Sequence, residues 1–203
     1  MTWLLKADRA VLFIILGFLA ILALTSAASV WWDSAVYIGM GKYVYSLGQS
    51  GLWEPARSLM MPLLLGFFWK IGINPAIAGV ILTAVFSAAS ILFLYLITKE
   101  LADKKTAITF SLLFALNLQL ITYSKIVLAD IPAMFFTLAA VWMLIRNRIA
   151  LAGAVTAMAV LTKFTSLILL PAMLAGILLR KKEQLQGSKS FAVGFSWLIV
   201  PTL

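Results

Sequence analysis

The chain has 203 residues, of which 64% are apolar and 11% are charged, and its formal net charge is +9. Soluble domains are roughly half apolar, so a mean hydropathy of +1.07 excludes an ordinary soluble domain and indicates a polytopic membrane protein. The absence of Cys and His also excludes a disulfide framework and the familiar ligand sets of zinc sites.

The first apolar run, residues 10–30, predicts an uncleaved transmembrane helix. It follows Lys6 and Arg9 and has no signal-peptide cleavage pattern. Trp31 and Trp32 come next, as is typical of a membrane–water interface, and they place Asp33 at the membrane surface. Residues 33–47 predict an amphipathic helix lying in the interface, because their apolar side chains recur at near-helical spacing.

The rest of the chain predicts further helices. Gly48, Gly51 and Pro55 end the interfacial helix, and the run 62–71 after Arg57 is too short to cross a bilayer. Longer apolar runs predict five more complete spans and the start of a seventh. These are residues 76–98, 106–124, 132–145, two short helices within 149–179 that meet at Lys163, and a segment beginning at Ser190. We therefore expect an all-α transmembrane bundle of about seven spans.

The distribution of basic residues predicts the orientation. With the N-terminus in the cytoplasm and a hairpin at Lys163, eleven Lys and Arg residues lie on the cytoplasmic side and five on the other side. The smaller group consists of Lys42, Arg57, Lys70, Lys125 and Lys163. The prediction is a multi-pass protein of the cell membrane with its polar site on the extracytoplasmic face.

Five charged residues gather at that predicted face: Asp33, Arg57, Lys125, Asp130 and Lys163. Charges near hydrocarbon are costly, so their convergence favours a polar cleft over five unrelated positions. Simpler interpretations stay open at this point. Asp33 and Asp130 are also suited to capping helices, and Arg57 and Lys163 to reaching lipid headgroups.

Four short stretches, in this order, resemble the GT-C superfamily of glycosyltransferases, in the branch of the protein O-mannosyltransferases and the lipid A aminoarabinose transferase. No single stretch is specific to the family, but the order of the four stretches and their placement on one membrane face are a stronger signal. They are Asp33-Ser34-Ala35-Val36-Tyr37, Arg57 with Pro62-Leu63-Leu64-Leu65-Gly66, Leu128-Ala129-Asp130-Ile131-Pro132, and Leu161-Thr162-Lys163 with Leu169-Leu170-Pro171. The resemblance covers essentially the whole chain, and we expect residues 1–203 to be the N-terminal transmembrane module of a longer protein.

The resemblance implies an inverting, mannosyltransferase-like transfer of a sugar from a polyprenyl-phosphate donor to a hydroxyl of a protein, lipid or glycan. Asp33 is then the expected catalytic base, and Arg57, Lys163 and Lys125 are expected to bind the donor phosphate. Asp130 and Tyr37 are expected to position the sugar or the acceptor. No cofactor is implied, and a divalent cation between Asp33 and Asp130 is a lower-ranked alternative.

Two other functional classes stay open from the sequence. A transporter or flippase of a lipid-linked anion would use the same cations at a midplane site. A membrane scaffold subunit would tolerate Asp33→Asn, whereas a glycosyltransferase would not. The basic composition does not indicate nucleic acid, because most of the cations lie beside apolar spans.

Overall fold

The computed structural model describes residues 8–25 and 31–178, and these residues are almost entirely helical. The predicted span beginning at Ser190 lies outside the described residues. The helices are α1 (Arg9–Leu24), α2 (Trp32–Tyr45), α3 (Met60–Lys70), α4 (Pro75–Leu101), α5 (Lys104–Ala115), α6 (Leu118–Tyr123), α7 (Asp130–Ile145), α8 (Ile149–Thr162), the 3-10 segment η2 (Phe164–Ile168) and α9 (Leu169–Leu178).

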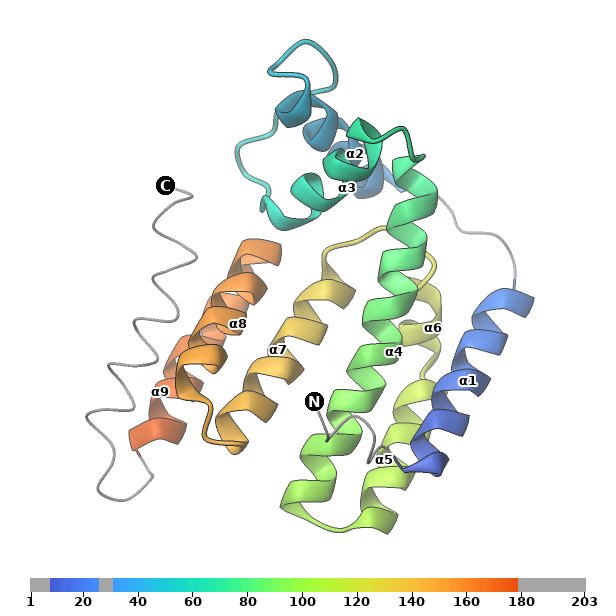
Figure 1. The fold of residues 1–203 in the computed structure, drawn as a ribbon, viewed down its shortest axis with the longest axis vertical. Coiled ribbons are helices and arrows are strands. Elements are labelled where there is room, and N and C mark those ends of the chain that lie inside the picture. The colour runs from blue at the N-terminus through green and yellow to red at the C-terminus, as the bar shows by residue number, and fades with distance from the viewer. Residues whose placement is uncertain (1–7, 26–30, 179–203) are drawn as a thin grey trace.

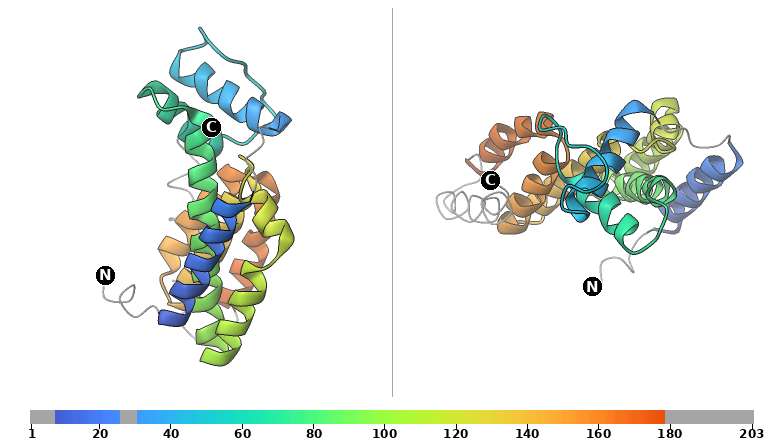
Figure 2. Two further views of the ribbon diagram at one scale, coloured as in Figure 1. Left: turned by 90° about the vertical axis from the view of Figure 1, so that its right-hand side faces the viewer. Right: turned by 90° about the horizontal axis from the view of Figure 1, so that it is seen from above.

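Most helices stand side by side in an up-and-down arrangement, while α2 and α3 lie across one end of them (Figure 1 and Figure 2). We call this the α2/α3 end. Helices α1, α5, α6 and α8 run toward this end, and α4 and α7 run away from it (Figure 1). The all-helical class is therefore confirmed.

The number of spans stays a prediction. Among the described helices only α4, with 27 residues, is long and apolar enough by itself to cross a membrane. Helices α1, α7 and α8 are apolar but have 14 to 16 residues, and about 20 residues are needed for a bilayer core. The predicted first helix is shorter in its described part, because α1 ends at Leu24.

Helix boundaries follow local side-chain chemistry. Asn74 accepts hydrogen bonds from the backbone N–H groups of Ala76 and Ile77, and Pro75 begins α4. Asp103 caps α5 in the same way through Lys105 and Thr106.

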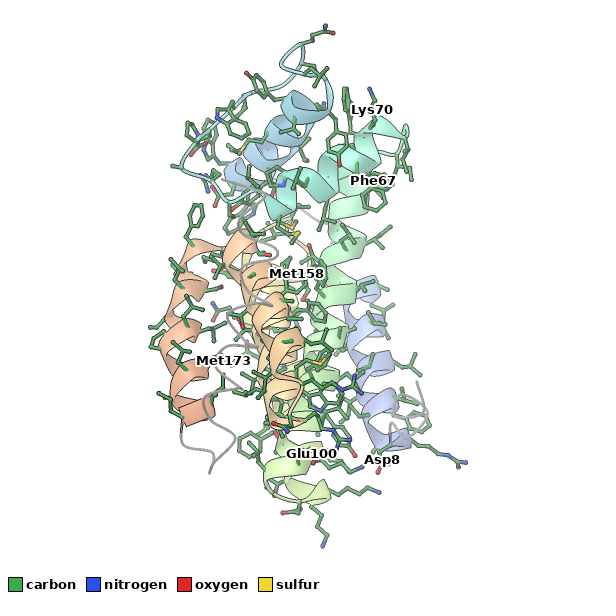
Figure 3. All side chains as sticks on the ribbon, turned by 60° about the vertical axis from the view of Figure 1, so that its left-hand side comes forward. Asp8, Phe67, Lys70, Glu100, Met158 and Met173 are labelled. Atoms are coloured by element: carbon green, nitrogen blue, oxygen red, sulfur yellow. The ribbon has the colours of Figure 1, made fainter. Side chains whose placement is uncertain are left out.

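The predicted hairpin at Lys163 is confirmed. Lys163 has extended backbone angles, φ −155° and ψ 120°, and so separates α8 from η2 and α9. Met158 of α8 and Met173 of α9 are labelled in Figure 3, where the two helices run side by side. Lys163 therefore lies at the tip of the hairpin, at the α2/α3 end.

The predicted span over residues 106–124 is not a single continuous helix. The helix breaks between α5 and α6, because Asn117 adopts an extended conformation and its side chain accepts a hydrogen bond from the N–H of Leu120. Asn117 therefore caps a helix within its own segment.

Within the described part of the chain, three buried clusters hold the helices together. The largest joins α1, α4, α5, α6 and α7 and includes Phe18, Ile91 and Tyr95. A second joins α7, α8 and α9 around Ala140 and Met173. The third packs α2 and α3 against the loop before α7. It consists of Tyr37, Met61, Leu65, Val127 and Ala129. This third cluster fixes the elements that carry the candidate site.

Helices α2 and α3 touch backbone to backbone at Gly41 and Gly66. A Cβ atom on Gly41 would lie 2.6 Å from the carbonyl oxygen of Pro62 and 2.7 Å from the backbone nitrogen of Gly66. No flexible side chain can move aside to make room, so any larger residue at Gly41 must push the two helices apart.

We expect Gly41→Ala to lower the free energy of unfolding by about 1–3 kcal/mol, the usual cost of overpacking. Thermal unfolding of the full-length protein in lipid nanodiscs measures the change. Gly17→Ala is the matched control, because a Cβ on Gly17 in α1 meets nothing within 4 Å. An equal melting temperature for Gly41→Ala and Gly17→Ala would contradict the close α2–α3 contact.

Candidate active site

The loop between α2 and α3 brings Arg57 onto Asp33 in the first turn of α2. Nη2 of Arg57 lies 2.8 Å from Oδ1 of Asp33, and Nε of Arg57 lies 3.0 Å from Oε1 of Glu54. These two contacts use two of the three guanidinium nitrogens, and a guanidinium has five N–H donors. Arg57 can therefore hold both carboxylates and still offer donors to a third, anionic group.

Tyr37 lies one helical turn beyond Asp33 and supports the same guanidinium. The carbon Cζ of Arg57 sits 5.7 Å from the centre of the Tyr37 ring, within range of a cation–π interaction. Hydrogen bonds to Asp33 and Glu54 raise the pKa of Arg57 above its already high ordinary value, so it stays charged. Burial raises the pKa of Tyr37, against the opposing effect of Arg57, so Tyr37 keeps its phenolic proton.

A second ion pair joins α7 to the tip of the α8–η2 hairpin. Nζ of Lys163 lies 2.5 Å from Oδ1 of Asp130. The N-cap of α7 is Ala129, and Asp130 is the first residue of the helix. Its carboxylate pairs with Lys163 rather than capping α7, and the alternative interpretation of Asp130 as a cap is not needed. Asp33 likewise pairs with Arg57, while Ser34 accepts the hydrogen bond of the Trp31 N–H at the start of α2.

A buried hydrogen bond connects the two ion pairs. The hydroxyl of Ser58 donates to the carbonyl oxygen of Thr162 over 2.5 Å, although the two residues are 104 positions apart. Ser58 follows Arg57 and Thr162 precedes Lys163, so this bond sets the spacing of the two cations. The charges of Asp33 and Asp130 also raise the pKa of Tyr37, in addition to its burial.

For the polyprenyl-phosphate donor that the resemblance implies, we expect Ser58→Ala to raise the KM about tenfold. The variant leaves the Thr162 carbonyl without its partner, which typically costs about 1–3 kcal/mol, and it loosens the spacing of the two cations. Steady-state kinetics measure the KM. Ser46→Ala is the control, because Ser46 makes its hydrogen bonds on the exposed outer turn after α2. Matching KM values for the two variants would contradict the role of Ser58.

The structure separates Lys125 from these ion pairs. Its ammonium contacts the hydroxyl of Thr25, at the end of α1. Lys125 lies at the α2/α3 end like the other predicted site residues, but the structure pairs it with neither Asp33 nor Asp130. Among the described residues, no three Asp, Glu, His or Cys side chains gather in one place.

The opposite end of the bundle is also charged but differently arranged. Asp8 pairs with Lys104 over 2.6 Å, and Glu100 pairs with Arg146 over 2.7 Å. Figure 3 labels Asp8 and Glu100 at this end and Lys70 at the α2/α3 end. The described members of the two predicted groups of basic residues lie at opposite ends of the bundle, whereas Lys6, Arg180, Lys181, Lys182 and Lys189 lie outside the described residues.

Sequence reasoning missed two functional candidates, Glu54 and Ser58. Glu54 lies three residues before Arg57 in a loop containing Gly and Pro, and this short spacing was a usable signal for an ion pair. Nothing in the sequence pointed to Ser58, because its partner is a backbone carbonyl from a distant helix.

The fold and the site together define a helical protein with paired carboxylates and cations at one end of its bundle. The family model for dolichyl-phosphate-mannose-protein mannosyltransferases matches residues 56–202. This match spans most of the chain, and the chain belongs to that family, which implies a membrane glycosyltransferase of the GT-C type. No curated protein and no solved structure matches the chain.

The matched range contains Arg57, Lys125, Asp130 and Lys163 but begins after Asp33, Tyr37 and Glu54. The ion pair between Asp33 and Arg57 therefore connects the N-terminal candidates to the matched part of the chain.

Proposed function

We propose that this protein transfers a sugar from a polyprenyl-phosphate donor to a hydroxyl acceptor, with inversion, at the extracytoplasmic membrane face. The observation that carries the proposal is the 2.8 Å pair between Asp33 and Arg57. It puts a carboxylate, able to take a proton, beside a planar cation suited to phosphate. The family membership supports the same class of reaction.

The reaction balances without another reactant. The acceptor oxygen attacks the anomeric carbon of the sugar, and its proton passes to Asp33. The bond between the anomeric carbon and the phosphate oxygen breaks, and its electron pair stays on the lipid phosphate. In this scheme Arg57 and Lys163 stabilise the charge that grows on the departing phosphate, and preorganised cations act most strongly where water is partly excluded.

The exposure of the two ion pairs suits this division of roles. The side chain of Asp33 is 43% exposed, so an acceptor hydroxyl can approach the carboxylate. Lys163 and Asp130 are 38% and 40% exposed, and an anionic group can therefore reach the ammonium beside Asp130. Glu54 holds Nε of Arg57 and so orients the guanidinium toward Asp33. We propose Lys125 as a peripheral contact to the phosphate. It lies at the α2/α3 end, but its ammonium contacts Thr25 and neither of the two carboxylates.

The test uses the full-length protein in detergent–lipid micelles with polyprenyl phosphates carrying radiolabelled mannose, glucose or galactose. The expected result is loss of the sugar from at least one donor, dependent on an added hydroxyl acceptor. Translocation of an intact donor across sealed vesicles, with no loss of sugar, would support the transporter alternative instead. Binding without turnover or translocation would support a scaffold.

A further inference from the structure

A cavity of about 350 Å³ lies between α5, α6 and α7 and reaches Asp130. Its lining is more apolar than polar, and the polar part comes from Asn117, Gln119, Tyr123 and Asp130. The lining residues are Phe114, Asn117, Gln119, Leu120, Tyr123, Asp130, Ile131 and Met134. Tyr123 and Asp130 lie where α6 ends and α7 begins, at the α2/α3 end, and Phe114 lies deeper, in the last turn of α5. The cavity therefore runs from the candidate active site into the helical layer.

The helix break at Asn117 opens onto this cavity. Helix α6 has six residues, so at 1.5 Å per residue the break lies about 9 Å below Tyr123. Within a membrane, an interrupted helix is tolerated where the irregular backbone is buried in protein or lines a cavity. Polar side chains at such depth are costly and are usually functional. Asn117 at the break and Gln119 beyond it both line the cavity, and both residues are exposed.

The polar groups of the cavity retain unused hydrogen-bonding capacity. Asp130 engages Lys163 through Oδ1, and its Oδ2 has no partner among the described residues. The Gln119 amide and the Tyr123 hydroxyl likewise make no hydrogen bond in the described part of the chain. A carboxylate oxygen, an amide and a phenol supply both donors and acceptors for hydroxyl groups.

The apolar side chains of the lining and the volume of the cavity also restrict which ligand can bind. Leu120, Ile131 and Met134 suit the C–H faces of a saturated ring. Small-molecule pockets are usually about 300–1,000 Å³, so this cavity is at the size of a single ring. A long prenyl chain would need neither the amides nor the carboxylate.

We propose that this cavity is a sugar subsite that holds the pyranose of the lipid-linked donor, with Gln119, Tyr123 and the free oxygen of Asp130 binding its hydroxyl groups. The proposal rests on the proposed function. The pairing of Asp130 with Lys163 places the sugar beside the cation expected to bind the donor phosphate. Asn117 shapes the subsite as the N-cap of α6, and its side-chain oxygen is already used in that cap.

The test is a binding measurement that needs no turnover. Full-length wild type and Gln119→Leu in lipid nanodiscs are titrated with polyprenyl-phosphate mannose and, separately, with polyprenyl phosphate lacking a sugar. We expect Gln119→Leu to weaken binding of the sugar-bearing lipid about tenfold and to change binding of the sugar-free lipid less than twofold. Leu118→Ala is the control, because Leu118 lies on α6 but does not line the cavity. Tyr123→Phe, which removes only the hydroxyl, is expected to act in the same direction.

The outcomes separate this proposal from the proposed function. Equal weakening of both lipids would overturn the sugar subsite and assign the cavity to the prenyl chain. Unchanged binding of both lipids would overturn it as well. If Gln119→Leu weakens only the sugar-bearing lipid while the wild type never consumes a donor, the subsite stands and the transferase proposal fails.

Discussion

Asp33→Asn is expected to lower the rate of sugar release from the lipid donor by at least about 100-fold. General base catalysis typically contributes about 10²–10⁴-fold, and an amide cannot take the acceptor proton. The donor should still bind, because Arg57 keeps Glu54 and Tyr37 as partners. Initial rates with a radiolabelled donor, together with the donor Kd, measure the two effects.

Asp103→Asn is the matched control for this experiment. Asp103 lies at the opposite end of the bundle, where it caps α5, and Asn is an equally good cap. A rate for Asp33→Asn within twofold of that for Asp103→Asn would remove Asp33 from the role of base and leave Asp130 as the next candidate. Such a result would also agree with the scaffold alternative.

Arg57→Lys is expected to lower kcat/KM for the donor by roughly 10²-fold, although the charge is preserved. A single ammonium cannot hold Asp33 and Glu54 in a fixed plane and also contact the phosphate, whereas the guanidinium fork can. Removing one preorganised donor to a developing anion typically costs about 10²–10³-fold. Both kcat and KM should change, because Arg57 is expected to contact the phosphate before and during bond cleavage.

Arg146→Lys is the control for Arg57→Lys. Arg146 also pairs with a carboxylate, that of Glu100 at 2.7 Å, but lies at the opposite end of the bundle. If both conservative changes alter the donor kinetics equally, the effect is a general one on the fold, and the phosphate-binding role of Arg57 is wrong.

The sequence was sufficient to predict the helical class, the hairpin at Lys163 and the end of the bundle at which the candidate residues meet. These predictions depend on long apolar runs interrupted by charges, and burial of a charge in hydrocarbon is costly enough to dictate where the chain turns. Lys163 shows this most clearly. A cation in the middle of an apolar run favoured two short helices, and the backbone does become extended there.

The sequence was not sufficient to predict which charges pair or where the third predicted span breaks. From the sequence Arg57 could have faced Asp130 as easily as Asp33, because its direction depends on the loop between α2 and α3, where Glu54 holds its Nε. Asn117 was ambiguous because an amide in an apolar run suits an interhelical bond and a cap equally well. The bond from Ser58 to Thr162 ends on a backbone carbonyl, which no side-chain pattern can reveal.

The most direct test of the transferase proposal is a double-label experiment on the full-length protein. The donor carries tritium in the sugar and phosphorus-32 in the phosphate, and both labels are followed in the presence of a hydroxyl acceptor. We predict that tritium moves to the acceptor while an equal amount of phosphorus-32 remains as polyprenyl phosphate, and that Asp33→Asn blocks both changes. Transfer of both labels together to the acceptor, or movement of the intact donor across the membrane, would contradict sugar transfer at the Asp33–Arg57 pair.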